Sequence, residues 1–367
     1  MSLTAALPII FLLGIILIAL EDFIKVNKAA VSVSMCLLMW VILLTHMNEV
    51  IALSHPAILE AFYKAWPGDM AQLSDSEVAG KYFGWLLENS LGGVSSTLFF
   101  VLASMAIVEI LDANGAFRVI TNAIRTRDKR SLVWVVSFIT FLLSAVLGNL
   151  ATVIIIVAVL RKIIPDRDVR LPFSCLSIIA ANAGGCWSPI GDVTTLLLWS
   201  AKNISALHQV SHLILPALIM VSLPALIVSL SYKKGEVVRG VSLQNESPLP
   251  AYLTHRVQSI LLAIGILTLA MVPVFQTWFN MPPYMCVLCG LAILWILTDR
   301  MASHSNDPRA GDLKVSQLFS HLDISTVLFF LGVLMSVEAL KQVGSLTVMA
   351  NAMNSAIPEP NVIAMVL

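Results

Sequence analysis

The 367-residue sequence is 58% hydrophobic and 12% charged, its 22 basic residues balance 22 acidic ones, and its mean hydropathy is +0.89. Soluble domains contain about 25% charged residues, so the composition excludes a soluble globular protein and predicts an all-α polytopic membrane protein. Its long apolar runs also exclude a transmembrane barrel, whose strands alternate over about ten residues. We expect the lipid bilayer around it and no nucleic-acid partner.

The N-terminal part of the chain predicts spans at Leu3–Leu20 and Ala29–Thr45, so that residues 1–45 form a first pair. The first run has no basic residues before it and no small-residue cleavage site, which is typical of a retained span rather than a signal peptide. Residues 46–93 are more polar and are predicted to form an extracytoplasmic loop with interfacial helices. The next span is expected at Val94–Leu111.

Residues 131–160 contain no charged side chain, although basic residues flank them on both sides. As a single helix this run would be about 45 Å long, against a hydrocarbon core of about 30 Å. The positive-inside rule places both flanks on the cytoplasmic side. A re-entrant hairpin satisfies length and charge together, with its tip near Ser144–Thr152.

Residues 171–201 begin and end as a membrane helix, but their middle is rich in glycine and polar residues. Backbone groups left unpaired in hydrocarbon cost several kcal/mol, so a broken helix survives only where it lines a cavity inside the protein. Secondary transporters build cation sites from such unwound segments near the bilayer midplane. We therefore predict a broken transmembrane helix that forms half of an ion site.

The second half of the chain repeats only part of this pattern. Residues 94–231 form a first repeat, 232–255 a cytoplasmic linker rich in Ser, Pro and Gly, and 256–367 an incomplete second repeat. Transporters of this kind contain two inverted repeats. Because the chain stops at Leu367 inside a new apolar run, we expect a truncation at the C-terminus.

The basic residues predict the orientation. With the N-terminus on the extracytoplasmic side, the cytoplasmic side receives 18 of the 22 Lys and Arg residues, all except Lys64, Lys81, Lys202 and Lys341. The opposite orientation reverses this ratio. We predict a multi-pass protein of the inner (plasma) membrane.

The segment Ala181-Asn-Ala-Gly-Gly-Cys-Trp-Ser-Pro-Ile-Gly-Asp-Val-Thr-Thr195 resembles NhaD-type sodium/proton antiporters of the ion-transporter superfamily. Leu160-Arg-Lys-Ile-Ile-Pro165, His321-Leu-Asp-Ile-Ser325 and Val327-Leu-Phe-Phe-Leu-Gly332 are similar to the same family. The resemblance implies the inverted-repeat ion-transporter fold and exchange of Na⁺, or also Li⁺, for H⁺. It implies no cofactor and leaves open a homodimer.

The hairpin tip departs from that family. Where members resemble Asp-Asn-Leu-Thr-Thr, this chain reads Gly148-Asn-Leu-Ala-Thr152. Gly148 replaces a carboxylate and Ala151 a hydroxyl group. Asp192 is then the only acid in the middle of an apolar run.

An intramembrane carboxylate is a functional candidate because it is costly to bury. Such a group can bind either H⁺ or a hard cation, and competition between the two, with alternating access, gives exchange. We predict Asp192 as the Na⁺ ligand, with neutral oxygens from Asn149, Thr152, Asn182, Ser188, Thr194 and Thr195. The backbone positions that open the hairpin and the helix are predicted to be Gly148, Gly184, Gly185, Pro189 and Gly191.

Other interpretations stay open at this point. Asp192 could simply cap the second half-helix, and polar side chains also hold membrane helices together. An oxyanion or dicarboxylate carrier of the same superfamily is the main alternative function, and a non-transporting remnant is another. No paired carboxylates or His-rich cluster occur within the spans, so an integral-membrane enzyme is not expected.

Overall fold

The computed structural model describes residues 3–54, 56–65, 73–124, 126–200, 202–238, 250–305 and 307–356. Over these ranges the named elements are helices, and eight of them are long and apolar enough to cross a membrane. The prediction of an all-α polytopic membrane protein is confirmed. The expected features of residues 239–249 and 357–367 lie outside the described residues.

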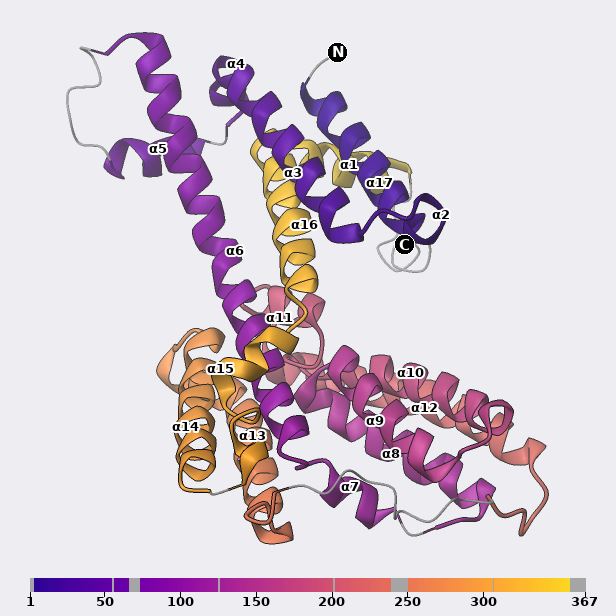
Figure 1. Cartoon of the computed structure of the whole chain (residues 1–367). Coiled ribbons are helices and arrows are strands. Elements are labelled where there is room, and N and C mark those ends of the chain that lie inside the picture. Colours follow the sequence, from indigo (N-terminus) through magenta and orange to yellow (C-terminus); the bar gives the residue numbers. More distant parts are fainter. Residues whose placement is uncertain are drawn as a thin grey trace. The chain divides into compact units, whose positions relative to one another are not determined.

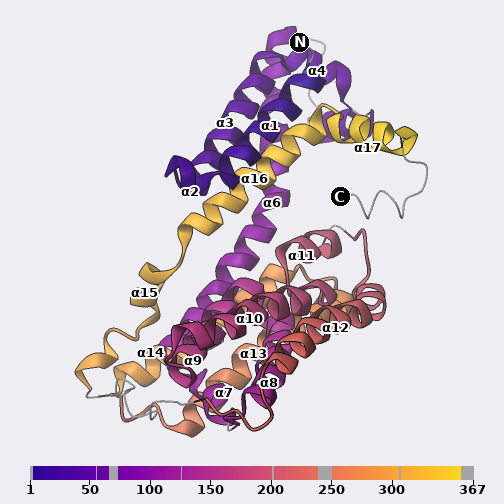
Figure 2. The same ribbon diagram turned by 90° about the vertical axis from the view of Figure 1, so that its right-hand side faces the viewer.

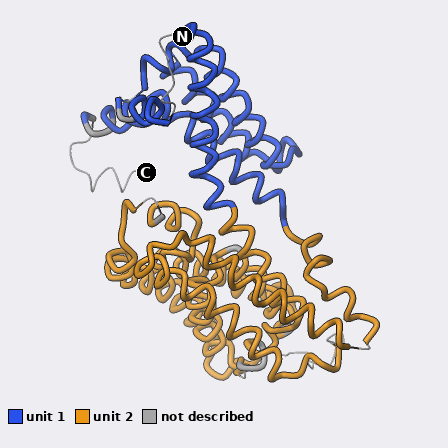
Figure 3. Tube along the Cα trace, turned by 90° about the vertical axis from the view of Figure 1, so that its left-hand side faces the viewer, with its two compact units in different colours: residues 1–98, 323–367 blue, residues 99–322 orange. Residues whose placement is uncertain are grey.

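The chain divides into two compact units, residues 1–98 with 323–367 and residues 99–322 (Figure 3). In the first unit, α1 (Leu3–Ala19), α3 (Lys28–Thr45) and α16 (Ile324–Gln342) pack side by side (Figure 2). The indole Nε1 of Trp40 donates to the carbonyl of Met335 over 3.0 Å. The unit also contains α2 (Glu21–Ile24), α4 (Met47–Leu53), α5 (Pro56–Ala65) and α17 (Ser345–Ala356).

Helix α6 (Asp75–Ala113) is longer than expected and belongs partly to each unit. It begins at Asp75, within the segment predicted as a loop, and continues without interruption through the expected span. Its start has a local cause, because the Glu77 carboxylate accepts hydrogen bonds from the backbone N–H and hydroxyl of Ser74. The bond from the Ser74 N–H to the Glu77 side chain is one half of the Ser-x-x-Glu capping box that starts helices. The extracytoplasmic position of residues 46–93 stays a prediction.

The second unit contains a bundle of α8 (Lys129–Leu147), α9 (Asn149–Ile163), α10 (Arg167–Trp187) and α12 (Ala206–Ser231), which pack against one another (Figure 1). A single residue, Gly148, separates α8 from α9, so the segment 131–160 is a helix–turn–helix. Its re-entrant placement in a bilayer stays a prediction. The short helix α11 (Val193–Ser200) follows α10 after a break, as expected for residues 171–201.

In the remainder of the second unit, α7 precedes this bundle along the chain and the other elements follow it. Helices α13 and α14 lie in the segment expected to form the incomplete second repeat. The elements are α7 (Arg118–Ala123), α13 (His255–Phe279), α14 (Pro283–Ser303), η3 (Pro308–Ala310), α15 (Val315–Leu318) and η4 (Phe319–His321).

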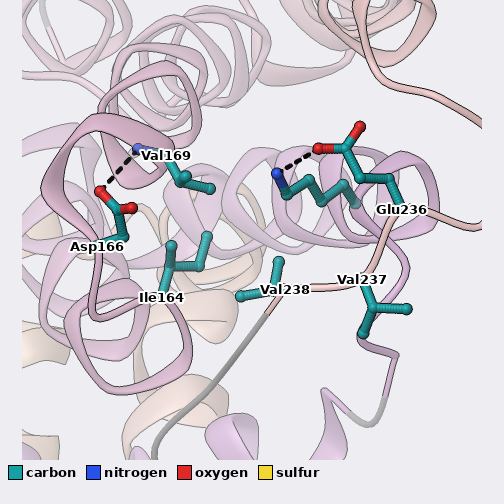
Figure 4. A pocket seen from close by; sticks show the side chains of 7 residues that line it. Ile164, Asp166, Val169, Glu236, Val237 and Val238 are labelled. Carbon is teal, nitrogen blue, oxygen red and sulfur yellow. Dashed lines mark hydrogen bonds and ion pairs between the residues drawn. The ribbon is translucent and has the colours of Figure 1, made fainter.

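The start of the expected linker is attached to the base of α8. The Lys129 ammonium donates to the Glu236 carboxylate over 2.6 Å, and the Lys129 N–H donates to the Glu236 carbonyl over 2.8 Å. The ammonium holds the pKa of the exposed Glu236 carboxyl below its usual value. A pocket of about 490 Å³ lies beside this contact (Figure 4), lined by Lys129, Ile164, Asp166, Val169, Glu236, Val237 and Val238.

Helices α8 and α10 approach one another closely at Gly184. A Cβ atom built at Gly184 would overlap the backbone carbonyl of Phe141 on α8. Small residues of this kind let the backbones of membrane helices come together. The same contact is supported by the Ser144 hydroxyl, which donates to the Ala181 carbonyl over 2.6 Å. The register of α8 on α10 therefore depends on a glycine.

We predict that Gly184→Ala lowers the thermal stability of the detergent-purified protein. The obstacle is backbone rather than a flexible side chain, and overpacking of this kind costs about 1–3 kcal/mol. The control is Gly84→Ala on α6, where an added Cβ meets nothing within 4 Å. An equal melting temperature for the Gly184→Ala protein and the wild type would contradict the close packing.

Candidate ion-binding site

The broken helix is interrupted between Trp187, the last residue of α10, and Val193, the first residue of α11. Pro189 and Gly191 lie in this interruption. Ser188 is extended, with φ −95° and ψ 137°. Pro189 explains this, because the residue before a proline is disfavoured in the helical region, and Pro189 itself has no N–H to donate. The Gly191 N–H donates to the Ser188 carbonyl over 3.4 Å, and helical bonding resumes from Asp192.

The half-buried Asp192 caps α11 with its side chain. Its Oδ1 accepts the backbone N–H of Thr194 over 3.0 Å and the Thr194 hydroxyl over 3.1 Å. The positive end of the α11 dipole favours a negative charge at this position. The capping role considered from the sequence is therefore present, and it uses one oxygen of the carboxylate.

The other carboxylate oxygen contacts the tip of the hairpin. The side-chain amide of Asn149, the first residue of α9, donates from Nδ2 to Asp192 Oδ2 over 2.8 Å. The same nitrogen lies 3.3 Å from Oδ1 of Asn182 on α10. Two oxygen atoms from the broken helix thus converge on one nitrogen from the hairpin. Of the residues that the sequence predicted for the site, the structure brings together Asp192, Asn149, Asn182 and Thr194; their role as ion ligands stays a prediction.

Three other candidate side chains do not contact the carboxylate of Asp192. The Ser188 hydroxyl donates to the Ala145 carbonyl over 2.5 Å, and the Thr195 hydroxyl donates to the carbonyls of Ser188 and Asp192 over 3.0 and 2.9 Å. Both therefore fix backbone rather than contact the carboxylate. Thr152 is fully buried one turn after Asn149, and its hydroxyl has no hydrogen-bond partner among the described residues.

The prediction that Gly184 and Gly185 open the helix is wrong, because both lie within α10 and serve close packing instead. A Cβ atom at Gly185 would lie 2.8 Å from the Gly191 carbonyl oxygen, so the end of α10 packs directly on the break. Gly148 has φ +84° and ψ 158°, a region of backbone space that is essentially restricted to glycine. The tight turn of the hairpin, which places Asn149 beside Asp192, therefore requires glycine at position 148.

Sequence reasoning missed Gln209 in the first turn of α12. Its Nε2 donates to the carbonyls of Cys186 and Ser188 over 3.0 and 3.1 Å. A polar side chain at the very start of an apolar helix was the available signal.

The carboxylate of Asp192 has about four lone-pair positions, and three of them accept the hydrogen bonds described above. A cation that approached Oδ2 would take the position now filled by the Asn149 amide. Rotation of that amide by 180° would turn its Oδ1 toward the same point. Oxygen donors from Asp192, Asn149 and Asn182 are ligands that hard cations prefer.

Comparison with known proteins shows the family to which the chain belongs. The model of the CitMHS family, described as citrate transporter, matches residues 9–367. The chain belongs to this family. It is 32% identical to sodium/proton antiporter 2 of Arabidopsis thaliana over 98% of the chain and 78% of that protein.

For two further relatives, the matched region is a smaller share of the relative's own length. The chain is 39% identical to sodium/proton antiporter 1 of Arabidopsis thaliana over 76% of the chain and 47% of that protein. It is 29% identical to Na(+)/H(+) antiporter NhaD of Vibrio cholerae over 75% of the chain and 60% of that protein. The chain thus spans about half the length of the first of these relatives. The resemblance to NhaD-type antiporters inferred from residues 181–195 is confirmed.

We predict that Gly148→Ala destabilises the protein even though the nearest atom to an added Cβ, the Gly191 carbonyl oxygen, is 3.7 Å away. Forcing a residue with a side chain into this conformation costs about 1–3 kcal/mol. Gly148→Asp, which introduces a carboxylate at the tip, should carry the same penalty. Thermal melting measures both variants.

Gly92→Ala on α6 is the control for this prediction, because that site is open and its φ is negative. Melting temperatures of the two position-148 variants that equal that of Gly92→Ala would contradict the backbone requirement at Gly148.

Proposed function

We propose that the chain is a secondary active transporter that exchanges Na⁺, or Li⁺, for H⁺ at Asp192. The observation that carries this proposal is the convergence of Asp192 Oδ2 and Asn182 Oδ1 on the Asn149 amide. It joins the hairpin tip to the broken helix through one carboxylate. The names of the relatives, which are antiporters from plants and bacteria, support it.

The exchange follows from competition at one group. With Asp192 ionised, Na⁺ binds its Oδ2, and Asn182 and the rotated amide of Asn149 supply neutral oxygens. With Asp192 protonated, its O–H can donate to the Asn149 oxygen in the same orientation, and the cation is excluded because the charge that binds it is lost. A transporter that opens alternately to each side then moves Na⁺ one way and H⁺ the other, without a cofactor.

The membrane arrangement is part of the proposal. The hairpin α8–α9 enters and leaves the bilayer on the cytoplasmic side, and the N-terminus lies outside the inner (plasma) membrane. The basic residues next to both ends of the hairpin support this orientation. Residues 94–231 act as the first of two inverted repeats, and the hairpin and the broken helix of that repeat supply the site.

An anion carrier is the second candidate, because the family model is described as citrate transporter and Gly148 leaves the hairpin tip without a charge. Such a site would present donors to the anion's carboxylates. The ionised side chain of Asp192 at the convergence point opposes this, since like charges repel. Uptake of radiolabelled citrate by proteoliposomes that contain the chain distinguishes an anion carrier from a Na⁺/H⁺ exchanger.

We predict that Asp192→Asn abolishes Na⁺-dependent proton movement in proteoliposomes that contain the 367-residue chain. The matched control is Asp166→Asn. Asp166 also accepts backbone N–H bonds at the start of a helix, from Asp168 and Val169. Asparagine caps helices as well as aspartate does, so both variants keep their caps and only one loses the charge of the proposed site.

Exchange that persists in Asp192→Asn, or that is lost equally in Asp166→Asn, would contradict the role of Asp192. Citrate uptake without Na⁺-dependent proton movement in the wild type would favour the anion carrier. Absence of both activities would favour a non-transporting protein.

A further inference from the structure

We infer that Gln209 of α12 is a positioning residue for Asp192, holding the backbone of the helix break from a third helix. The hairpin α8–α9 and the broken helix α10–α11 supply the groups of the proposed site. None of the site residues predicted from the sequence lies on α12. The inference rests on the proposed function only where it concerns the binding of Na⁺; the structural role stands on geometry alone.

The amide of Gln209 occupies the place where the break leaves carbonyl groups without helical donors. The carbonyls in the last turn of a helix have no partner within it, and Cys186 lies in that turn of α10. Gln209 Nε2 donates to Cys186 over 3.0 Å and to Ser188 over 3.1 Å. One side chain thus bridges two carbonyls on either side of Trp187.

A chain of hydrogen bonds connects this amide to Asp192. The Ser188 carbonyl accepts from both Gln209 and Thr195, and the Thr195 hydroxyl also lies 2.9 Å from the Asp192 carbonyl. Gln209 therefore helps to fix the two ends of the five-residue break, 188 to 192. The direction of the Asp192 carboxylate toward Asn149 depends on that backbone.

The burial of Gln209 argues against a role as filler. Its side chain is 3% exposed, and its Oε1 is buried without a hydrogen-bond partner among the described residues. Leaving a buried acceptor unsatisfied is unfavourable, so a residue that only filled space here would need no amide. The two hydrogen bonds that Nε2 donates offset the cost of the unpaired Oε1. We therefore infer that Gln209 stabilises the backbone at the helix break.

This arrangement gives α12 a means to influence the site. Gln209 is in the first turn of α12, where its own N–H donates to the carbonyl of Ser205. A displacement of that turn would move the carbonyls of Cys186 and Ser188 through their hydrogen bonds to Gln209 and so change the orientation of Asp192. The position of α12 should therefore affect the affinity for the cation rather than the chemistry at the carboxylate.

Gln258 provides a closely matched control. It is the fourth residue of α13, as Gln209 is of α12; it is 6% exposed, and its Nε2 donates to the Leu253 carbonyl over 3.1 Å. Gln209→Met and Gln258→Met each replace a buried amide by a side chain of similar length. Both should lower the melting temperature, but only the first removes donors from the break.

The first measurement is amide hydrogen exchange of residues 185–199 in the detergent-purified chain, which requires no transport. We expect faster exchange in Gln209→Met than in the wild type and Gln258→Met. Gln209→Glu should exchange at a rate between the wild type and Gln209→Met at low pH, where the single O–H of the protonated acid can replace one of the two bonds, and should resemble Gln209→Met at high pH. Equal exchange in Gln209→Met and Gln258→Met would overturn the inference, whatever the transport activity.

The second measurement is Na⁺-dependent proton movement in proteoliposomes. Loss of the positioning bonds should raise the KM for Na⁺ about tenfold in Gln209→Met, with a smaller effect on kcat, and Gln258→Met should keep the wild-type KM. An unchanged KM would overturn the role at the ion site. A wild-type chain without Na⁺-dependent exchange would instead refute the proposed function, and hydrogen exchange would still decide whether Gln209 holds the break.

Discussion

The carbonyl groups released where α10 ends at Trp187 are the constraint on which the rest of this unit depends. Within a bilayer no water would satisfy them, so donors must come from the protein. They come from two helices: Thr195 on α11 donates to the Ser188 carbonyl, and Gln209 on α12 donates to the carbonyls of Cys186 and Ser188. The Ser188 hydroxyl in turn donates to the Ala145 carbonyl on α8. A break that would be unstable alone is thereby held rigidly enough to orient one carboxylate.

The same constraint explains the small residues around the break. Donors can reach the backbone only if the helices lie close together, and Gly184 and Gly185 remove the side chains that would separate α10 from α8 and from residue 191. The predicted glycines therefore have two separate tasks. Gly184 and Gly185 permit close packing, whereas Gly148 permits a backbone conformation that brings Asn149 to Asp192.

Much of this could be predicted from the sequence because bilayer physics restricts the possible structures. The helices, a break within residues 171–201 and the helix–turn–helix around Gly148 followed from hydropathy, run length and the positions of Gly and Pro, whereas the exact bounds of the break, after Gly184 and Gly185, did not. The meeting of Asn149 and Asp192 followed from placing the hairpin tip and the helix break at similar depth. The start of α6 at Asp75 was missed, although Ser74 and Glu77 carry a capping signal.

Directions of side chains could not be predicted in the same way. A serine or threonine in a broken helix can face an ion or a neighbouring carbonyl, and the hydroxyls of Ser188 and Thr195 face carbonyls. Nor does a sequence indicate which helix will supply the donors for a break, so Gln209 was not found. The conformation of Gly148 also shows that a carboxylate at that position would need a different turn.

The measurement that tests the central claim most directly is equilibrium binding of ²²Na⁺ to the purified chain as a function of pH. If one carboxylate holds either H⁺ or Na⁺, the apparent Kd for Na⁺ rises about tenfold for each unit of pH below the point where Asp192 gains its proton, and it levels off above that point. Asp192→Asn should bind no Na⁺ in the same range. A Kd that does not change with pH, or binding that persists in Asp192→Asn, would contradict competition at Asp192.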